Sequence, residues 1–299
     1  MRSLEYKKSA KELLQYLNFK LDAIEGFPDQ PTWGYAFTLL AALQYEADLN
    51  KNELAQKALA LYEKQSKPQK IFSWEFTTFA INLSATLTKE QRILDLCAYK
   101  AKGTRMINWA LLRQLNKVYT GKDSIVTGFI LRIIKLLFTT SDGQILDEFY
   151  TRSLQYHAFC LFVLTELDKT GRYPWVSDWL IRGCRFSNKM ILNDGTALYI
   201  GRGQEQIFGY GALIYALEYV DKHYKQKFES SIEKVWHHVS SFQREDGSYP
   251  LVLRSYQAEH GDISYDSDKP HGWYSYNTLY DYQPFLAYCL LMAANESEK

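Results

Sequence analysis

Cysteine is scarce in this chain. Its 299 residues include only four cysteines, which are widely spaced: Cys97, Cys160, Cys184 and Cys289. None forms a Cys-x-x-Cys pair or a cysteine–histidine group with the spacing of metal ligands. This pattern argues against a small disulfide scaffold and against a zinc centre. We therefore expect free thiols in a reducing compartment, and neither a metal nor a cofactor.

Long apolar runs and an excess of either charge are also missing. The most apolar stretch, residues 125–138, carries Arg132 and Lys135 and is too short to span a bilayer. The first eight residues are polar and unlike a secretion signal. With 35 basic and 34 acidic residues, the chain has no global field that would attract nucleic acid. We expect a cytoplasmic protein without a membrane span; its oligomeric state is not indicated.

A repeat of fixed length is the most informative feature that is present. Asp-Gly pairs stand at 142–143, 194–195 and 246–247, so both intervals are 52 residues. The apolar segments 160–164 and 212–216 follow the same register. Fifty-two residues hold two helices and their connections, and the chain is slightly shorter than six such units. The sequence therefore predicts an all-α (α/α)6 toroid of about six helical hairpins, in one domain spanning residues 1–299.

Helical periodicity predicts about twelve segments that alternate between an outer and an inner position. Outer segments such as 52–64 are amphipathic, whereas inner segments such as 35–43 and 158–164 are apolar nearly all round. The inner helix starts should converge at one end of the toroid, where we expect the site. The predicted segments are 4–20, 33–47, 51–65, 73–85, 89–100, 106–119, 123–139, 149–167, 174–191, 205–220, 222–242 and 279–294.

The connections between outer and inner helices carry two kinds of signal. Each Asp-Gly pair is interpreted mainly as a turn, because Asp can bond the backbone ahead of it and Gly supplies positive φ. The third repeat contains an insertion, residues 254–277, after a short extended piece at 249–253. Insertions of this length are usually functional or disordered, and the aromatic residues of this one argue against simple disorder. We expect it to cover the site and to supply substrate-binding side chains from His271, Trp273 and Tyr276.

The first motif with chemical content follows the first Asp-Gly pair. It reads Arg152-Ser153-Leu154-Gln155-Tyr156-His157 at an inner helix start, and Asn108-Trp109 stands at the preceding inner helix start. Over residues 100–220 this arrangement resembles the toroid domain of heparinase II/III-type polysaccharide lyases. The resemblance implies that Tyr156 is a catalytic base or acid, with His157 beside it. It also implies that Asn108 binds the substrate carboxylate; Trp109 stands where that family commonly has His.

The implied reaction is β-elimination from a uronate. It needs a base for the C5 proton, an acid for the departing oxygen, and donors that stabilise the carboxylate charge. A tyrosine can transfer the proton, and an Asn amide, an Arg or a helix N-terminus can stabilise the charge. Tyr156, Asn108 and Arg152 all stand near inner helix starts, which suits an anionic sugar. The alternative is that Tyr156 and His157 are core residues with satisfied polar tips.

The second motif, residues 201–211, occupies the same place one repeat later. It lacks the preceding strand of a dinucleotide-binding loop and the Gly-Lys-Ser/Thr of a phosphate loop. Its glycines indicate backbone lying close to a ligand or to a neighbouring helix. We interpret Gly209 and Gly211 as packing residues. The other polar residues are expected at the site, Arg202 and Glu205 as catalytic groups and Gln204, Gln206 and Tyr210, with Trp109 and Arg152, as substrate-binding groups.

Four functions remain open from the sequence. The leading one is a lyase acting on an acidic oligosaccharide or polysaccharide. The second is a glycoside hydrolase, in which Glu205 would pair with Glu75, Asp142, Asp194 or Asp262. The third is a terpene-cyclase-like toroid, suggested by residues 242–250, although the acidic clusters of such enzymes are absent. The fourth is a non-catalytic carbohydrate-binding toroid. A calcium ion at Asp262, Asp266 and Asp268 also stays open.

Overall fold

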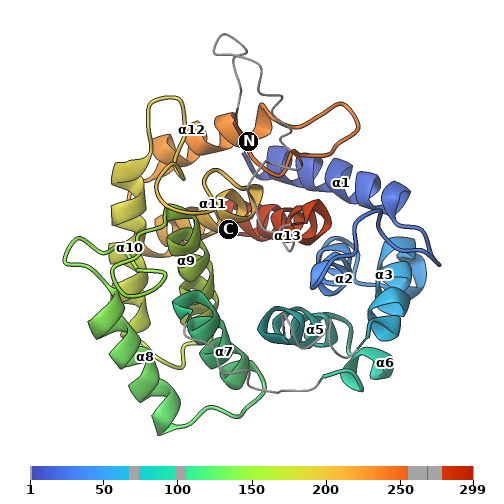
Figure 1. Cartoon of the computed structure of the whole chain (residues 1–299), viewed down its shortest axis with the longest axis horizontal. Helices are drawn as coiled ribbons and strands as arrows, with labels where there is room; N and C mark the ends of the chain where they lie inside the picture. Colours follow the sequence, from blue (N-terminus) through green and yellow to red (C-terminus); the bar gives the residue numbers. More distant parts are fainter. Residues whose placement is uncertain (1, 67–73, 98–105, 255–267, 269–277, 299) are drawn as a thin grey trace.

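The computed structural model describes residues 2–66, 74–97, 106–254, 268 and 278–298. Over these residues the helices alternate between an outer and an inner ring (Figure 1). The outer helices are α1 (Arg2–Lys20), α3 (Glu53–Lys64), α6 (Gln91–Leu94), α8 (Ile125–Phe138), α10 (Val176–Met190) and α12 (Glu229–Ser240). The inner helices are α2 (Gly34–Tyr45), α5 (Trp74–Thr88), α7 (Ile107–Tyr119), α9 (Leu154–Lys169), α11 (Ile207–Tyr224) and α13 (Leu279–Glu298).

The inner helices form a closed ring. Each packs against its neighbours in the order α2, α5, α7, α9, α11 and α13, and α13 packs back against α2. The chain enters every inner helix from the outer one before it, so all inner helices begin at the same end of the ring. The predicted all-α toroid of six helical hairpins is thereby confirmed. The short 3-10 helix η1 (Leu49–Lys51) lies between the first two hairpins.

Some predicted helix limits were wrong. Helix α9 begins at Leu154 and not at residue 149, because the Ser153 side chain accepts a hydrogen bond from the Tyr156 N–H and caps the helix there. The segment predicted at 89–100 contains only α6 within its described residues. The extended piece at 249–253 is confirmed, since Leu251 and Val252 pair with the backbone that precedes α11.

Aromatic rings fill the centre of the inner ring, so the toroid has a packed core. Near the helix starts the rings form a closed circuit: Trp33–Phe76 5.0 Å, Phe76–Phe159 5.2 Å, Phe159–Phe208 4.8 Å, Phe208–Tyr282 5.1 Å and Tyr282–Trp33 5.8 Å between centroids. A second layer lies deeper. It contains Phe37, Phe79, Phe162, Phe285 and Tyr288. The first circuit, which we call the aromatic floor, limits how deeply a ligand can enter.

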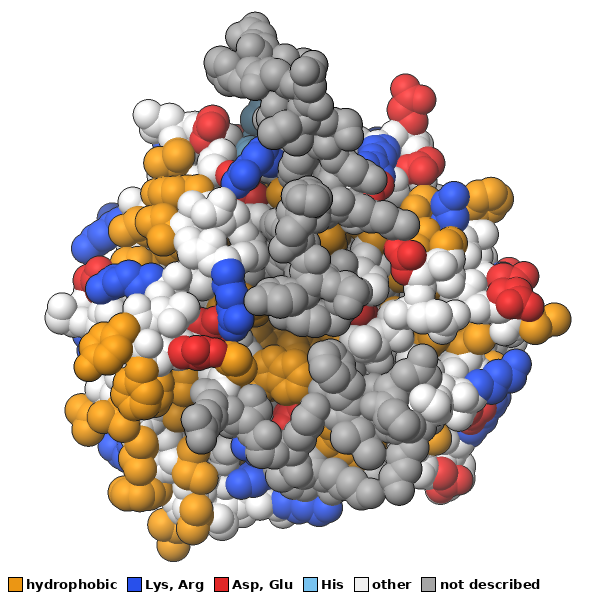
Figure 2. Space-filling view, viewed as in Figure 1, with side chains coloured by type: hydrophobic (Ala, Val, Ile, Leu, Met, Phe, Trp, Pro, Cys, Tyr) orange, Lys and Arg blue, Asp and Glu red, His pale blue; other side chains and the backbone are white. Residues whose placement is uncertain are grey.

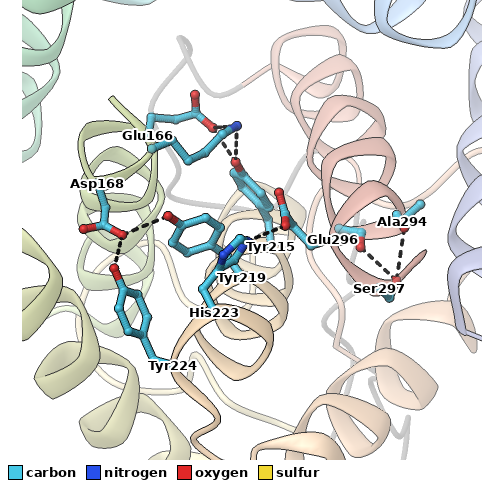
Figure 3. A network of polar contacts seen from close by, with 11 residues as sticks. Glu166, Asp168, Tyr215, Tyr219, His223, Tyr224, Ala294, Glu296 and Ser297 are labelled. Carbon is cyan, nitrogen blue, oxygen red and sulfur yellow. Dashed lines mark hydrogen bonds and ion pairs between the residues drawn. The ribbon is translucent and has the colours of Figure 1, made fainter. Parts of the chain in front are cut away.

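A polar network lies at the opposite end, where the inner helices finish (Figure 3). The buried Glu166 carboxylate accepts hydrogen bonds from Tyr119 at 2.6 Å and Tyr215 at 2.5 Å, and it pairs with Lys169 at 3.1 Å. Beside it, Asp168 accepts from two further tyrosines of α11. These bonds join the ends of α7, α9 and α11. None of these side chains has a buried polar atom without a partner, which fits a structural role.

The three Asp-Gly pairs form the same turn, as predicted. Gly143, Gly195 and Gly247 have φ of +105°, +89° and +85°. A Cβ on each would lie 2.1–2.5 Å from a backbone carbonyl oxygen of the next outer helix, in α10, α12 and α1 respectively. The turns therefore require glycine for both conformation and close approach. This accounts for the repeat without a catalytic role.

Candidate functional site

A buried aspartate organises the polar residues at the starts of α7 and α9. Asp147 is fully buried in the loop before α9. Its carboxylate accepts from Arg202 Nε at 2.9 Å and from Asn108 Nδ2 at 2.9 Å. Burial raises the pKa of Asp147, and the Arg202 guanidinium opposes that rise. Its backbone carbonyl also accepts from the Ile107 N–H, so Asp147 ties the start of α7 to the loop that carries Arg202.

Arg202 and Tyr156 lie together beside this aspartate. The guanidinium carbon of Arg202 is 4.9 Å from the centre of the Tyr156 ring. Tyr156 is half-buried in the first turn of α9, and the Arg202 side chain is 39% exposed. A partly exposed cation held against a phenol, at the end of the ring where the inner helices begin, is a suitable contact point for an anionic ligand.

Asn108 completes this group from α7, and Trp109 follows it in the same helix. Asn108 is buried, and its Oδ1 has no partner among the described residues. Trp109 is half-buried and packs edge-on against Phe76 of the aromatic floor, at 5.5 Å between centroids. The structure thus brings together three of the nominated residues, Asn108, Tyr156 and Arg202, with Trp109 following Asn108 in α7. We call this group, with Asp147, the α7–α9 cluster.

Glu205 belongs to a second polar group, before α11. Its carboxylate accepts from Arg254 Nε at 2.7 Å, and Gln204 Oε1 accepts from Arg254 Nη2 at 2.9 Å. Glu205 also has a φ of +56°, which is unusual for a residue with a side chain. Its backbone is held in this conformation by bonds with Leu198 and Leu253. The Glu205 carboxylate is therefore paired with an arginine of the protein itself.

Several nominated residues lie in the interior. His157 is fully buried; its Nδ1 accepts from the Ile145 N–H at 3.0 Å, and its Nε2 lies 3.2 Å from the Gly183 carbonyl oxygen. Burial lowers the pKa of His157 to about 4. Tyr210 is likewise buried and accepts from the Ala197 N–H at 3.2 Å. The expectation that Gln206 faces the open end is not met, because it is buried against Gln155 at 3.0 Å.

Arg152 and the inserted loop complete the account of the nominated residues. Arg152 donates to Gln144 Oε1 at 2.6 Å, within the first Asp-Gly connection. His271, Trp273 and Tyr276 lie outside the described residues, as do Asp262 and Asp266. Asp268 pairs with Arg244 at 2.9 Å. Among the described residues, no group of three His, Cys, Asp or Glu side chains could hold a metal ion.

Two buried carboxylates at inner helix starts were not nominated for these roles by the sequence. Asp281 accepts from the backbone N–H groups of Thr32 and Trp33, at 3.2 and 2.9 Å, and so caps α2 from α13. Burial raises its pKa to about 6. Asp147, described above, is the other. No local sequence pattern distinguishes either aspartate from an exposed one. Their burial is evident only from the helices that pack around them.

Comparison with known proteins identifies the fold and no closer relationship. No protein-family model matches this chain, and no curated protein sequence does. Among solved structures, a polysaccharide lyase matches 100% of this chain and 98% of its own at TM-score 0.68 and 11% identity. The α-1,6-mannanase GH76A of Salegentibacter sp. HEL1_6 matches 98% and 100% at TM-score 0.65 and 13% identity.

A glycosyl hydrolase of family 88 from Bacteroides vulgatus is also similar, with 97% of this chain and 99% of that chain covered at TM-score 0.63 and 9% identity. These likenesses establish the (α/α)6 toroid. They do not identify the heparinase II/III type. Separately, none of the described helices combines the length and apolar character needed to cross a bilayer.

Proposed function

We propose that this chain is a carbohydrate-active enzyme that works at the end of the toroid where the inner helices begin. Aromatic residues and a few convergent polar groups are typical of small-molecule sites. Here the aromatic floor and Trp109 lie next to the α7–α9 cluster. The similar solved structures include a lyase and two hydrolases named for carbohydrate chemistry, which supports a sugar ligand.

Within that class we propose a lyase that cleaves a uronate-containing oligosaccharide or polysaccharide. The observation that carries this is the pairing of Tyr156 with the Arg202 guanidinium, 4.9 Å from its ring. In the proposed reaction Tyr156 acts as a phenolate beside the Arg202 guanidinium and removes the C5 proton. The C4–O4 bond breaks as the C4=C5 double bond forms, and the departing oxygen takes this proton back from the Tyr156 phenol, so that Tyr156 serves first as base and then as acid. Arg202, with the backbone N–H of Asn108 in the first turn of α7, stabilises the negative charge that develops on the substrate carboxylate.

A glycoside hydrolase is the second candidate function. The carboxylates that could act in such an enzyme already have partners within the protein, which makes this function less favoured. Glu205 pairs with Arg254, and buried Glu75 pairs with Arg113 at 3.1 Å. Both carboxylates are at least nine-tenths buried and bonded to an arginine of the protein, so they are poorly placed to reach a glycosidic bond. Asp142 and Asp194 bond within their own turns. The similar mannanase keeps this alternative open for a neutral sugar.

The test is absorbance in the unsaturated-uronate band during incubation with glucuronate-, galacturonate- and mannuronate-containing substrates. We expect absorbance to rise with the wild type. The rate of this rise should be at least a hundredfold lower for Tyr156→Phe. Tyr45→Phe, which alters an exposed tyrosine at the far end of α2, is the matched control. New reducing ends without absorbance would favour the hydrolase. Equal rates for Tyr156→Phe and the wild type would remove Tyr156 from the mechanism.

A further inference from the structure

The outward face of α8 is apolar and uncovered. Six large side chains on this outer helix are exposed, with Ile125 93%, Leu136 79% and Phe129 62% accessible. The other three are Val126, Ile133 and Leu137. Figure 2 shows hydrophobic side chains gathered over this part of the molecule, at the lower left. Single exposed apolar residues are ordinary, whereas a contiguous row marks an interaction surface.

The repeat supplies an internal comparison for this face. Moving the six positions by 52 residues gives their equivalents in α10, and moving them by 104 gives those at α12. In α10 five of the six are polar: Ser177, Asp178, Arg185, Asn188 and Lys189, with Ile181 as the exception. At α12 all six are polar: Glu229, Ser230, Glu233, His237, Ser240 and Ser241. An outer helix of this toroid therefore does not need an apolar outward face, and α8 departs from its own repeat.

The apolar surface continues beyond α8. Phe138 at the helix end packs at a tilt against Phe149, with 4.4 Å between ring centroids, and Phe149 and Tyr150 are 61% and 94% exposed. Phe149, Tyr150 and the six side chains of α8 make eight, and at roughly 100 Å² each, about half the area of a large side chain, they offer about the 800 Å² per partner that a specific interface buries. The surface is thus large enough for a stable protein contact.

We propose that this surface joins two copies of the chain in a two-fold dimer. Ile125, Phe129, Ile133 and Leu137 form an unbroken ridge at i, i+4 spacing, and two such ridges interdigitate when identical helices cross. In an antiparallel pair, Phe129 of one copy meets Ile133 of the other, and the helix dipoles oppose each other favourably.

The charged residues of α8 favour a second copy over an anionic lipid surface. Lys135 pairs with Asp178 at 3.3 Å, and Arg132 lies over the Trp175 ring at 4.8 Å. Both cations are drawn to the flank facing α10. The ridge is left apolar, and α8 does not display the basic row that attracts anionic membranes.

The test is sedimentation equilibrium of the full chain at micromolar concentrations. The wild type should be a dimer. Phe129→Glu and Ile133→Lys, alone, should each weaken association at least tenfold. Mixing these two variants should restore dimers, because the introduced charges meet across the two-fold axis. Glu233→Lys, at the position equivalent to Phe129 in α12, is the matched control and should leave the dimer intact.

Three results would overturn the proposal. A monomeric wild type at these concentrations would exclude the dimer. A dimer that survives Phe129→Glu would place the interface on another surface. Co-flotation of monomers with phosphatidylserine vesicles, lost in Phe129→Glu, would assign α8 to a lipid surface instead. Circular dichroism of each variant, expected to match the wild type, separates loss of contact from loss of fold.

Discussion

His157 is the clearest case of a residue whose chemistry serves the fold. Its two ring nitrogens engage Ile145 and Gly183 inside the protein. We predict that His157→Leu destabilises the protein by about 2–4 kcal/mol, because it leaves a buried donor and a buried acceptor unpaired. His157→Gln, whose amide can accept and donate in the same place, should lose less than half of that. Chemical denaturation measures both, and a His157→Gln variant that folds but lacks all activity would instead support a catalytic role.

The burial of His157 also predicts that the protein loses stability at low pH. The pKa of His157 is about 4 in the folded protein, below the value of 6.5 that applies when unfolded. The unfolded chain therefore binds the proton first, and stability is lost as pH falls from about 6.5 towards 4, by up to about 3 kcal/mol. Asp281, with its pKa raised to about 6, acts in the opposite direction. Comparing wild type with His157→Gln isolates the histidine; identical pH profiles would contradict the account.

Asp147 should matter for the geometry of the α7–α9 cluster. Asp147→Ala removes the carboxylate that holds Arg202 and Asn108. We expect a loss of about 1–3 kcal/mol in unfolding free energy, moderated because Arg202 is partly exposed to solvent. Glu148→Ala, at the next position, should change stability by less than about 0.5 kcal/mol. Equal effects of the two substitutions would mean that the Asp147 bonds carry no net stability.

Sequence reasoning identified part of this cluster. Tyr156 and Asn108 were nominated by a motif resemblance, and Arg202 by its place in the repeat; the structure brings these three together. Gln206 and Tyr210 have the same polar character but are enclosed by neighbouring helices. Periodicity reports which side of its own helix a residue occupies and not what packs above it. This is why their burial, and the role of Asp147, could not be predicted.

At the scale of elements, the Asp-Gly turns explain how successive hairpins stack. Gly195→Ala places a Cβ 2.1 Å from the Lys234 carbonyl oxygen and forces φ of +89° on alanine. We predict a loss of about 2–5 kcal/mol from strain and overpacking together. Gly171→Ala, with φ of +64° and no atom within 4 Å of its Cβ, isolates the strain and should cost about 1–2 kcal/mol. Equal losses by denaturant titration would show that the close approach is unimportant.

Most elements could be predicted because inner and outer helices differ in pattern. Helix α2 is buried from Gly34 to Leu43, whereas α3 buries one stripe only. The errors fell at helix ends, such as the start of α9, where a serine cap outweighs propensity. The sequence showed α8 only as an apolar segment too short to span a membrane. Which of its side chains are exposed depends on how the helix is oriented in the toroid, and the sequence does not show this.

At the scale of the molecule, the first hairpin closes the ring against the last two. Tyr6 of α1 is fully buried; it packs on Trp236 of α12 at 4.7 Å and donates to Glu218 of α11 at 2.9 Å. We predict that Tyr6→Ala costs about 3–5 kcal/mol. Tyr6→Phe keeps the ring contact and should cost about 1 kcal/mol. Thermal unfolding measures both, and a small loss for Tyr6→Ala would mean that closure rests on other contacts.

The toroid itself was predictable from the 52-residue repeat, because a unit of two helices repeated about six times has few ways to bury every apolar face. The chemistry is not repeated. It depends on residues such as Arg202 and Tyr156 that come from different hairpins and meet only in the folded protein. The same toroid occurs in structures named as lyases and as hydrolases, so the fold leaves the reaction open.

The central claim is that the α7–α9 cluster binds an acidic sugar through Arg202. Isothermal titration of a uronate oligosaccharide, and of its carboxyl-reduced neutral counterpart, tests it directly. We predict at least tenfold tighter binding of the acidic ligand, a preference lost in Arg202→Gln and kept in Arg185→Gln, which alters an exposed arginine of α10. Equal binding of the two ligands, or an unchanged preference in Arg202→Gln, would contradict it.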